Sequence, residues 1–392
     1  MNWLLYALNQ IFMMNKNLIL LIALALASCS SEDSSKSGND DFQFSYKIDT
    51  VMVDAGDHFF FLNEDLSLSD VSKDRKLLYN LNPKTFLLEI VNLDDLKLEK
   101  TVQLEKEGPD GIGLPYYGKI QVLENGNIGL FGQFKIHIVT EQGKLVKTID
   151  LDQIKIQNND QKEKEKIGWN SVLSDDGKLL ASTLVNFDFK KPAKGIVVID
   201  LETDSIKYIP MKLFEKLKQF EIIHQEGNAP GITTGEFPFL RFIDNNLIIS
   251  SSAYNEVYHY NTSSDSLSHY SFKASLTDNE KIRNFPNEVH SSKEWTDAEK
   301  AKNEQVSFRE FLKLPEQNIF WRLSTDKDRM IADSVVFKQV ATFFDADFKM
   351  LKEQELENFH DFRNSFFKDG MLYSFINIED ELAFVRLKPN FD

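Results

Sequence analysis

The chain has 392 residues, with 45 lysines and arginines against 61 aspartates and glutamates, so its net charge at pH 7 is −16. Such an acidic body repels phosphate backbones, which disfavours nucleic-acid binding. A single cysteine excludes a disulfide framework, and the sequence has no Asp-x-Asp-x-Asp-Gly loop that would predict a calcium site.

The first predicted element is a secretory signal peptide that covers residues 1–28. Lys16 supplies its positive charge, and Leu18 to Ala27 form its apolar core. This core of about ten residues is too short to cross a bilayer, which needs about 20. Because Met1 to Met13 are apolar and carry no positive charge, translation from Met14 is a second interpretation of this region.

Cys29 ends the run Leu26-Ala27-Ser28-Cys29, which resembles the lipobox of bacterial lipoproteins. The resemblance implies that Cys29 receives a diacylglyceryl thioether and becomes the first residue of the mature protein. Cys29 is therefore the predicted lipid attachment site, and a membrane is the first predicted partner. The alternative is an ordinary cysteine near a cleaved signal peptide.

Residues 29–42 are polar and acidic, a composition typical of a flexible tether. Acidic residues directly after the cysteine also resemble the export signal of Bacteroidetes lipoproteins that reach the outer face of the outer membrane. The predicted location is the cell envelope, with the protein anchored to the outer membrane. Surface exposure and a periplasmic orientation both stay open.

Residues 43–392 are predicted to form a single domain of repeated β units. Six segments open with a turn and continue as an apolar strand: 76–79, 126–131, 177–181, 246–250, 318–321 and 370–375. Asn-Gly and Asp-Gly pairs in several of these turns permit the positive φ angles of tight hairpins. A second strand-like segment follows the first five: 88–92, 136–140, 197–200, 257–261 and 341–345. One unit then holds about four strands, the size of a propeller blade.

The two ends of this domain are predicted to pair with each other. The last unit, at residues 382–387, reaches the C-terminus without an outer strand, whereas the run at residues 44–53 has no unit of its own. Pairing them supplies the missing strand and removes two exposed sheet edges. The predicted fold class is therefore all-β, a six-bladed β-propeller whose N-terminal strand closes the last blade.

Two insertions break the strand pattern, and each predicts a short helix. Between blades three and four, residues 211–220 have apolar positions at helical spacing. Between blades four and five, Thr296 and Glu299 have the spacing of a capping box, which predicts a helix through Gln305. Both insertions are expected to cover neighbouring parts of one rim.

Three features together resemble a known group of proteins. They are the lipobox, the segment Glu107 to Gly113, and the strand Phe320-Trp321-Arg322. The chain is similar in these features to Bacteroidetes lipoproteins with a six-bladed β-propeller body, a domain-of-unknown-function family. The resemblance implies a fold and a location in the envelope, and it supplies no catalytic or binding residues.

Four residues are candidates for binding a ligand, namely Arg241, Arg322, Arg363 and His360. Arg241 falls on a predicted inner strand, and Arg363 and His360 come just ahead of another. A guanidinium that lines the central channel of a propeller can bind a carboxylate or sulfate. The alternative is that each arginine ties neighbouring blades together. Metal-binding or catalytic chemistry at His360 is a further alternative.

Two functions are consistent with this pattern. The first is a monomeric, non-enzymatic binding module that presents one rim to a protein, peptide or glycan ligand, with no cofactor and no metal. The second is a propeller enzyme, a glycan lyase or hydrolase, with its site at the channel mouth. Because the sequence contains neither a zinc-type histidine motif nor a Gly-x-Ser-x-Gly elbow, the first function is favoured.

Overall fold

The computed structural model describes residues 42–113, 117–156, 165–186, 194–225, 231–236, 238–332, 334–357, 359 and 364–391. These residues belong to one compact unit, Asn39–Asp392. The predicted signal peptide, Cys29 and all of the predicted tether except Phe42 lie outside the described residues, as do His360 and Arg363. Within the described ranges, no helix is long and apolar enough to cross a membrane.

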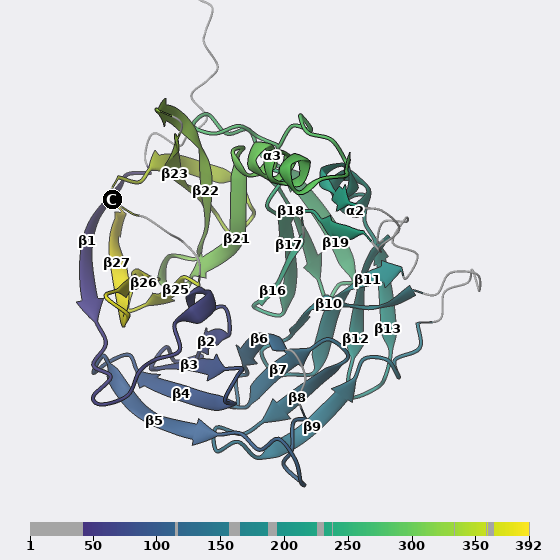
Figure 1. Cartoon of the computed structure of the whole chain (residues 1–392), viewed down its shortest axis with the longest axis vertical. Coiled ribbons are helices and arrows are strands. Elements are labelled where there is room, and N and C mark those ends of the chain that lie inside the picture. The colour runs from purple at the N-terminus through teal and green to yellow at the C-terminus, as the bar shows by residue number, and fades with distance from the viewer. Residues whose placement is uncertain are drawn as a thin grey trace, which may run out of the picture. The chain divides into compact units, whose positions relative to one another are not determined.

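The described strands include six four-stranded antiparallel sheets, which follow one another along the chain (Figure 1). The first sheet contains β2 (Ser69–Val71), β3 (Leu77–Asn82), β4 (Leu87–Asn92) and β5 (Lys97–Gln103), and the second contains β6 (Tyr117–Val122), β7 (Ile128–Gly132), β8 (Lys135–Val139) and β9 (Leu145–Asp150). The third contains β10 (Glu165–Leu173), β11 (Leu179–Asn186), β12 (Gly195–Asp200) and β13 (Ile206–Pro210), and the fourth contains β16 (Pro238–Ile243), β17 (Asn246–Ser251), β18 (Glu256–Asn261) and β19 (Ser266–Ser271). The fifth contains β21 (Ser307–Leu314), β22 (Ile319–Ile331), β23 (Ser334–Phe344) and β24 (Met350–Glu355), and the last contains β25 (Phe366–Lys368), β26 (Met371–Ile378), β27 (Glu381–Phe391) and β1 (Phe44–Met52).

Within this unit the sheets are arranged in a ring, and the first strand of each sheet lies nearest its centre (Figure 1). The all-β, propeller-like architecture predicted from the repeats is confirmed. All six predicted turn-and-strand segments fall on the second strands of the sheets, β3, β7, β11, β17, β22 and β26. The five segments predicted downstream fall on β4, β8, β12, β18 and β23.

Side chains at the strand ends explain the tight turns between consecutive strands. Asn82, Asn92, Asp200 and Asn261 each end a strand, and the Oδ1 atom of each accepts hydrogen bonds from two backbone N–H groups of the following turn. Such local bonds favour reversal of the chain over continuation of the strand. Five of the six sheets consist of strands that are consecutive in sequence, and β1 joins the sixth.

The N-terminal strand closes the last sheet, as predicted. Strand β1 pairs antiparallel with β27 over nine residues, from Phe44 opposite Phe391 to Met52 opposite Ala383. Arg386 of β27 donates two hydrogen bonds to the carboxylate of Asp49 on β1, at 2.8 and 2.6 Å. The two ends of the described chain are thus held together by a full strand pair.

The hydrophobic core is divided among the interfaces between successive sheets. Ile90 of the first sheet and Ile128 of the second share one cluster, and four other clusters join the second to the third sheet, the third to the fourth, the fourth to the fifth and the fifth to the last. A sixth cluster contains Leu78 of the first sheet and Phe384 of the last. The last sheet therefore packs on the first.

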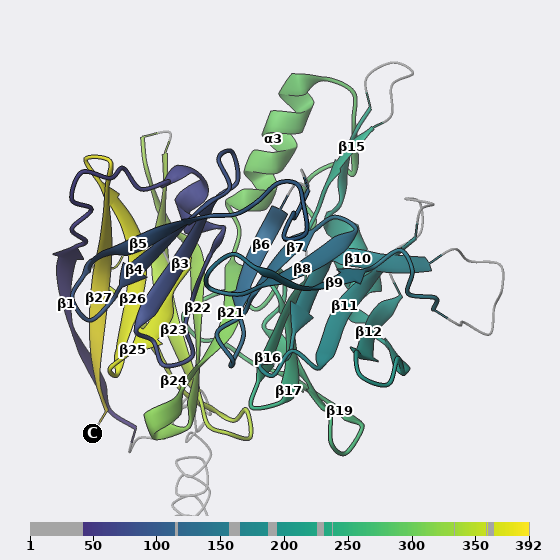
Figure 2. The same cartoon turned by 90° about the horizontal axis from the view of Figure 1, so that it is seen from below.

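The two insertions meet beside the fourth sheet and project together from one face of the ring (Figure 2). The first contains α2 (Leu213–Leu217), the 3₁₀ turn η2 (Lys218–Phe220), β14 (Ile222–His224) and β15 (Ile232–Thr234), and the second contains β20 (Glu288–Val289) and α3 (Ser292–Asn303). Strand β14 pairs with β15 and, in parallel, with β20, so that one small sheet joins both insertions. The predicted adjacency of the insertions is confirmed. Two further 3₁₀ turns are η1 (Asn63–Leu66) and η3 (Pro315–Gln317).

Helix α3 begins earlier than the sequence predicted. Its N-cap is Ser291, whose side chain accepts a hydrogen bond from the backbone N–H of Glu294, and Glu294 accepts one from the N–H of His290. The capping box is therefore Ser291 with Glu294, one turn and a half before the predicted pair. Thr296 lies inside the helix, and its hydroxyl donates to the carbonyl of Ser292.

Candidate functional site

Polar side chains on the inner strands join consecutive sheets from the first to the fifth. Asp70 of β2 accepts a hydrogen bond from the backbone N–H of Val122 on β6, at 2.7 Å. Gln121 of β6 donates to the carbonyl of Leu173 on β10 and accepts from its N–H, at 2.7 and 3.0 Å. These bonds satisfy backbone groups that the sheets themselves leave unpaired, and they fix the spacing of the inner strands.

The next links follow the same direction around the ring. Asn170 of β10 donates to the carbonyl of Pro238 at the start of β16, at 2.5 Å. Arg241 of β16 then forms an ion pair with Glu310 of β21, with 2.9 Å between Nη1 and Oε1. The Arg241 side chain is 32% exposed and that of Glu310 is 44% exposed, so solvent reaches this pair.

Two further cations lie close to Arg241. Lys119 of β6 donates to the carbonyl of Ser171 at 3.3 Å, and burial lowers the pKa of its ammonium group, while the charges of Glu310 and Asp70 oppose that shift. Arg75 follows β2 in the turn to β3. Burial lowers the pKa of Arg75, and so does the positive charge of Arg241. Gly118, next to Lys119, has open space around the position that a Cβ would take.

We call this group the inner-strand charge cluster; it comprises Asp70, Arg75, Lys119, Asp175, Arg241 and Glu310. The negative charge of Glu310 is the main cause that raises the pKa of Arg241, with smaller contributions from Asp70 and Asp175. The members come from four inner strands and two turns, which lie far apart in sequence. The ring places them within electrostatic reach of one another.

Not every charge in the cluster has a partner of opposite charge in contact with it. Asp70 uses its two carboxylate oxygens for the N–H groups of Val71 and Val122, and Asp175 forms an ion pair with Lys73. Among the described residues, neither Lys119 nor Arg75 has a carboxylate in contact with it. Two part-buried cations therefore lie beside the Arg241 pair and could accept an anionic group.

Arg322 is placed differently from Arg241. It lies on β22, the second strand of its sheet, and is only 1% exposed. Its guanidinium carbon is between 4.6 and 5.6 Å from the ring centroids of Phe272, Phe308, Phe311 and Phe344. Nη2 donates to the side-chain oxygen of Asn255, and the amide nitrogen of Asn255 donates to the side-chain oxygen of Asn279. At this position Arg322 joins aromatic side chains and a loop inside the protein and does not reach the inner-strand charge cluster.

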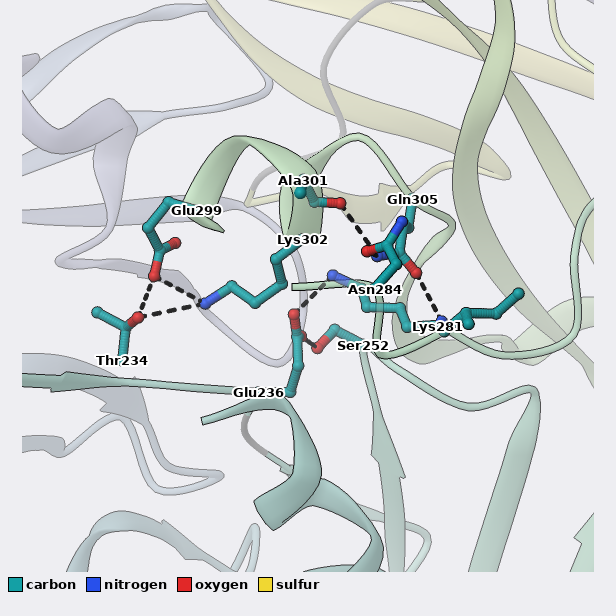
Figure 3. Close-up of polar contacts among 10 residues, drawn as sticks. Thr234, Glu236, Ser252, Lys281, Asn284, Glu299, Ala301, Lys302 and Gln305 are labelled. Atoms are coloured by element: carbon teal, nitrogen blue, oxygen red, sulfur yellow. Dashed lines mark hydrogen bonds and ion pairs between the residues drawn. The ribbon is translucent and has the colours of Figure 1, made fainter. Parts of the chain in front are cut away.

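A second polar network lies beneath the insertions (Figure 3). The carboxylate of Glu236 accepts hydrogen bonds from Lys281, at 2.6 Å, and from Ser252, while Lys302 of α3 contacts Glu299 and Thr234 at 3.0 and 3.3 Å. The Lys281 side chain is 3% exposed. Each buried ammonium group has a carboxylate partner, so we interpret this network as the attachment of the insertions to the body.

A buried carboxylate also holds the segment between β1 and β2. Glu89 on β4 accepts hydrogen bonds from the N–H of Phe61 and from the amide of Asn80, and lies 2.7 Å from Nε2 of His58. These three partners occupy both oxygens of Glu89, which favours a structural role over acid–base chemistry. In the part of the chain that the structure describes, no group of three or more His, Cys, Asp or Glu side chains could hold a metal ion.

Of the four sequence candidates, the structure places only Arg241 in the inner-strand charge cluster, and His360 and Arg363 lie outside the described residues. Lys119, Arg75 and Glu310 were not predicted. All three are charged residues that lie on, or shortly after, the strand that precedes a turn-and-strand segment. Arg241 was a candidate because it lies at the equivalent place. Which of these charges meet across the ring depends on the positions of strands that are far apart in sequence.

Comparisons with known proteins give a family and a fold. The sequence matches the model of a domain of unknown function, DUF4221, over residues 41–355. The crystal structure of a DUF4221 family member from Bacteroides vulgatus is similar, with a TM-score of 0.64 and 13% identity, covering 90% of this chain and 99% of that one. A Bacteroides fragilis structure, of a protein named as exported, has a TM-score of 0.49 and 11% identity, covering 91% and 98%. The comparison with curated proteins found no significant match.

Proposed function

The chain belongs to the DUF4221 family, and from that premise and the geometry of the inner strands we propose that it is a ligand-binding module of the cell envelope. The predicted membership of a domain-of-unknown-function family is confirmed. The proposal adds a lipid anchor at Cys29, attachment to the outer membrane, a monomeric six-bladed β-propeller body, and a binding site at the inner-strand charge cluster.

Two observations support six blades. Six core clusters each join one sheet to the next, and one of them joins the last sheet to the first. Strand β1 occupies the outer edge of the last sheet, where a propeller needs its closing strand. Each four-stranded sheet then corresponds to one blade.

The observation that carries the binding proposal is the pair of cations without a contacting carboxylate. Lys119 and Arg75 are half-buried beside Arg241, and solvent reaches the Arg241 side chain. In a chain of net charge −16, these three cations from separate sheets balance the three acids of the cluster. Guanidinium and ammonium groups in this arrangement bind carboxylate, sulfate or phosphate oxygens through charge-assisted hydrogen bonds. The proposed ligand therefore carries an anionic group.

Calorimetric titration of the purified full-length protein in detergent tests this proposal, with D-glucuronate, sulfate and inorganic phosphate as separate ligands. We expect at least one of them to bind, and Lys119→Met and Arg241→Gln each to weaken binding about tenfold, since each removes one charge-assisted contact. Lys349→Met, which removes an exposed lysine from the turn between β23 and β24, is the matched control and should bind like the unmodified protein. Equal affinity in all four proteins would contradict the assigned site.

A further inference from the structure

We propose that Glu310 is an internal counter-ion that holds Arg241 in the unliganded protein, and that the anionic group of the ligand displaces it. This inference rests on the proposed function, because it concerns the same cluster. It assigns to Glu310 a role opposite to that of the cations: Glu310 competes with the ligand and so sets its affinity.

The three acids of the cluster differ in how firmly they are held. Both oxygens of Asp70 accept backbone N–H groups, so its removal would leave the inner strands of two sheets with unpaired donors. Asp175 is paired with Lys73, in the turn that follows β2. Among the described residues, Glu310 forms an ion pair with Arg241 alone, and its side chain is 44% exposed. Glu310 is therefore the acid that can turn into solvent at the lowest cost.

The position of the Glu310 carboxylate suits a ligand anion. It lies 2.9 Å from Nη1 of Arg241, and it is close enough to Lys119 for its charge to oppose the lowering of the Lys119 pKa by burial. An oxyanion in the same place would interact with Arg241 and Lys119 together. It would also neutralise the positive charge that the departing carboxylate leaves uncompensated, so Arg241 keeps an anionic partner throughout.

The neighbouring positive charges explain why an internal carboxylate belongs at this position. Isolated guanidinium groups gathered at one place repel each other, and an internal carboxylate reduces that repulsion. The ion pair is part-exposed, so it contributes little to stability and its rupture costs little. A ligand with two or more anionic oxygens gains contacts that one Glu310 side chain does not provide, which favours exchange.

The variant Glu310→Gln tests the inference by the same calorimetric titration of the full-length protein with D-glucuronate, sulfate and inorganic phosphate. Removing the competing charge should tighten binding about fivefold, since a part-exposed ion pair no longer has to be broken. The matched control is Glu316→Gln, which removes the same charge from an exposed glutamate in η3, directly after β21. Glu316→Gln should bind like the unmodified protein. Circular dichroism and the melting temperature show whether each variant is folded.

The outcomes separate this inference from the proposed function. Tighter binding in Glu310→Gln alone supports both, and binding that appears only in Glu310→Gln supports a site blocked by this residue. Binding by the unmodified protein that is unchanged or weaker in Glu310→Gln overturns the counter-ion role and leaves the binding module standing. Equal tightening in Glu316→Gln shows a general charge effect and also overturns the role. No binding by any variant at concentrations up to about 10 mM overturns both proposals.

Discussion

Arg322 shows how a charged side chain can serve as part of a hydrophobic interface. Four phenylalanine rings surround its guanidinium, and its Nε and Nη1 atoms have no hydrogen-bond partner among the described residues. Burial lowers the pKa of Arg322, because the charged form loses its hydration. Cation–π attraction and the bond to Asn255 offset part of that cost. The side chain therefore contributes volume and contacts more than it contributes charge.

Substitutions at Arg322 should separate volume from charge. Arg322→Ala leaves a cavity among the four rings and should lower the free energy of unfolding by about 3 kcal/mol. Arg322→Met keeps an unbranched side chain of similar reach and removes the buried charge, so we expect a change within about 1 kcal/mol. Urea unfolding followed by tryptophan fluorescence measures both. A methionine variant as unstable as the alanine variant would mean that the charge itself holds this interface.

The buried ion pair of Glu236 and Lys281 leads to a related prediction about the stability cost of an unpaired buried charge. Glu236→Gln leaves the Lys281 ammonium group buried without an anion and should cost about 3 kcal/mol of unfolding free energy. The double variant Glu236→Gln with Lys281→Met removes the stranded charge and should recover most of that loss. The exposed pair Lys293 and Asp297 on α3 is the comparison, where Asp297→Asn should leave the free energy of unfolding nearly unchanged. A double variant less stable than Glu236→Gln would exclude a stranded charge as the cause.

At the scale of elements, α3 shows where sequence prediction succeeds and where it stops. Ser291 with Glu294 and Thr296 with Glu299 both have the capping-box spacing, and both precede helix-compatible residues. Local sequence therefore predicts a helix but does not choose its first residue. The choice depends on packing, because Ala298 and Lys302 are buried against the small sheet that joins the insertions. The sequence likewise did not predict that β22 and β23 stay paired beyond the ends of their neighbours β21 and β24. No local pattern states where a neighbouring strand ends.

Strand β1 should show a pH dependence that originates in one ion pair. The hydrogen bond from Arg386 lowers the pKa of Asp49 from its ordinary value of 3.8, so the folded state favours the ionised carboxylate. The stabilisation is therefore present above about pH 4 and is lost as the pH falls through the lowered pKa. The Asp49 side chain is 57% exposed, which limits the contribution to less than about 1 kcal/mol. Asp49→Asn should be slightly less stable than the unmodified protein at pH 7, and the difference should be smaller at pH 3. An equal difference at both values would mean that the ion pair is not its source.

Removal of β1 tests its role as a closing strand. A chain that begins at Asp54 exposes the whole edge of β27, so we expect a lower melting temperature and concentration-dependent aggregation. A synthetic peptide of residues 42–53 should restore the melting temperature, because it supplies the same nine paired residues. A control peptide with Asp49→Lys places a positive charge against Arg386 and should restore less. If neither peptide has an effect, β1 does not act as a separable closing strand.

At the scale of the whole molecule, the sequence predicted more of the fold than of the site. Repeated turn-and-strand segments are local, and they identified the second strands of all six sheets and the pairing of both chain ends. The inner strands are short in β2 and β25 and carry little pattern of their own. Arg241 was a candidate because of its strand, whereas Lys119 and Glu310 acquire meaning only through the ring that brings β6, β16 and β21 together.

The anchor proposed at Cys29 leads to the last prediction. A diacylglyceryl group supplies two acyl chains, and two lipid groups give stable attachment where one gives only marginal binding. Serine cannot form the thioether, so Cys29→Ser should move the protein from the membrane fraction to the soluble fraction and abolish incorporation of labelled palmitate. Ser30→Ala changes the neighbouring residue and keeps the cysteine. It should therefore leave both the membrane location and the palmitate incorporation unaltered. The melting temperature of the body should be the same in both variants, because the anchor precedes the described strands. Palmitate incorporation that persists in Cys29→Ser would exclude Cys29 as the attachment site, and protease added to intact cells then distinguishes a surface-exposed body from a periplasmic one.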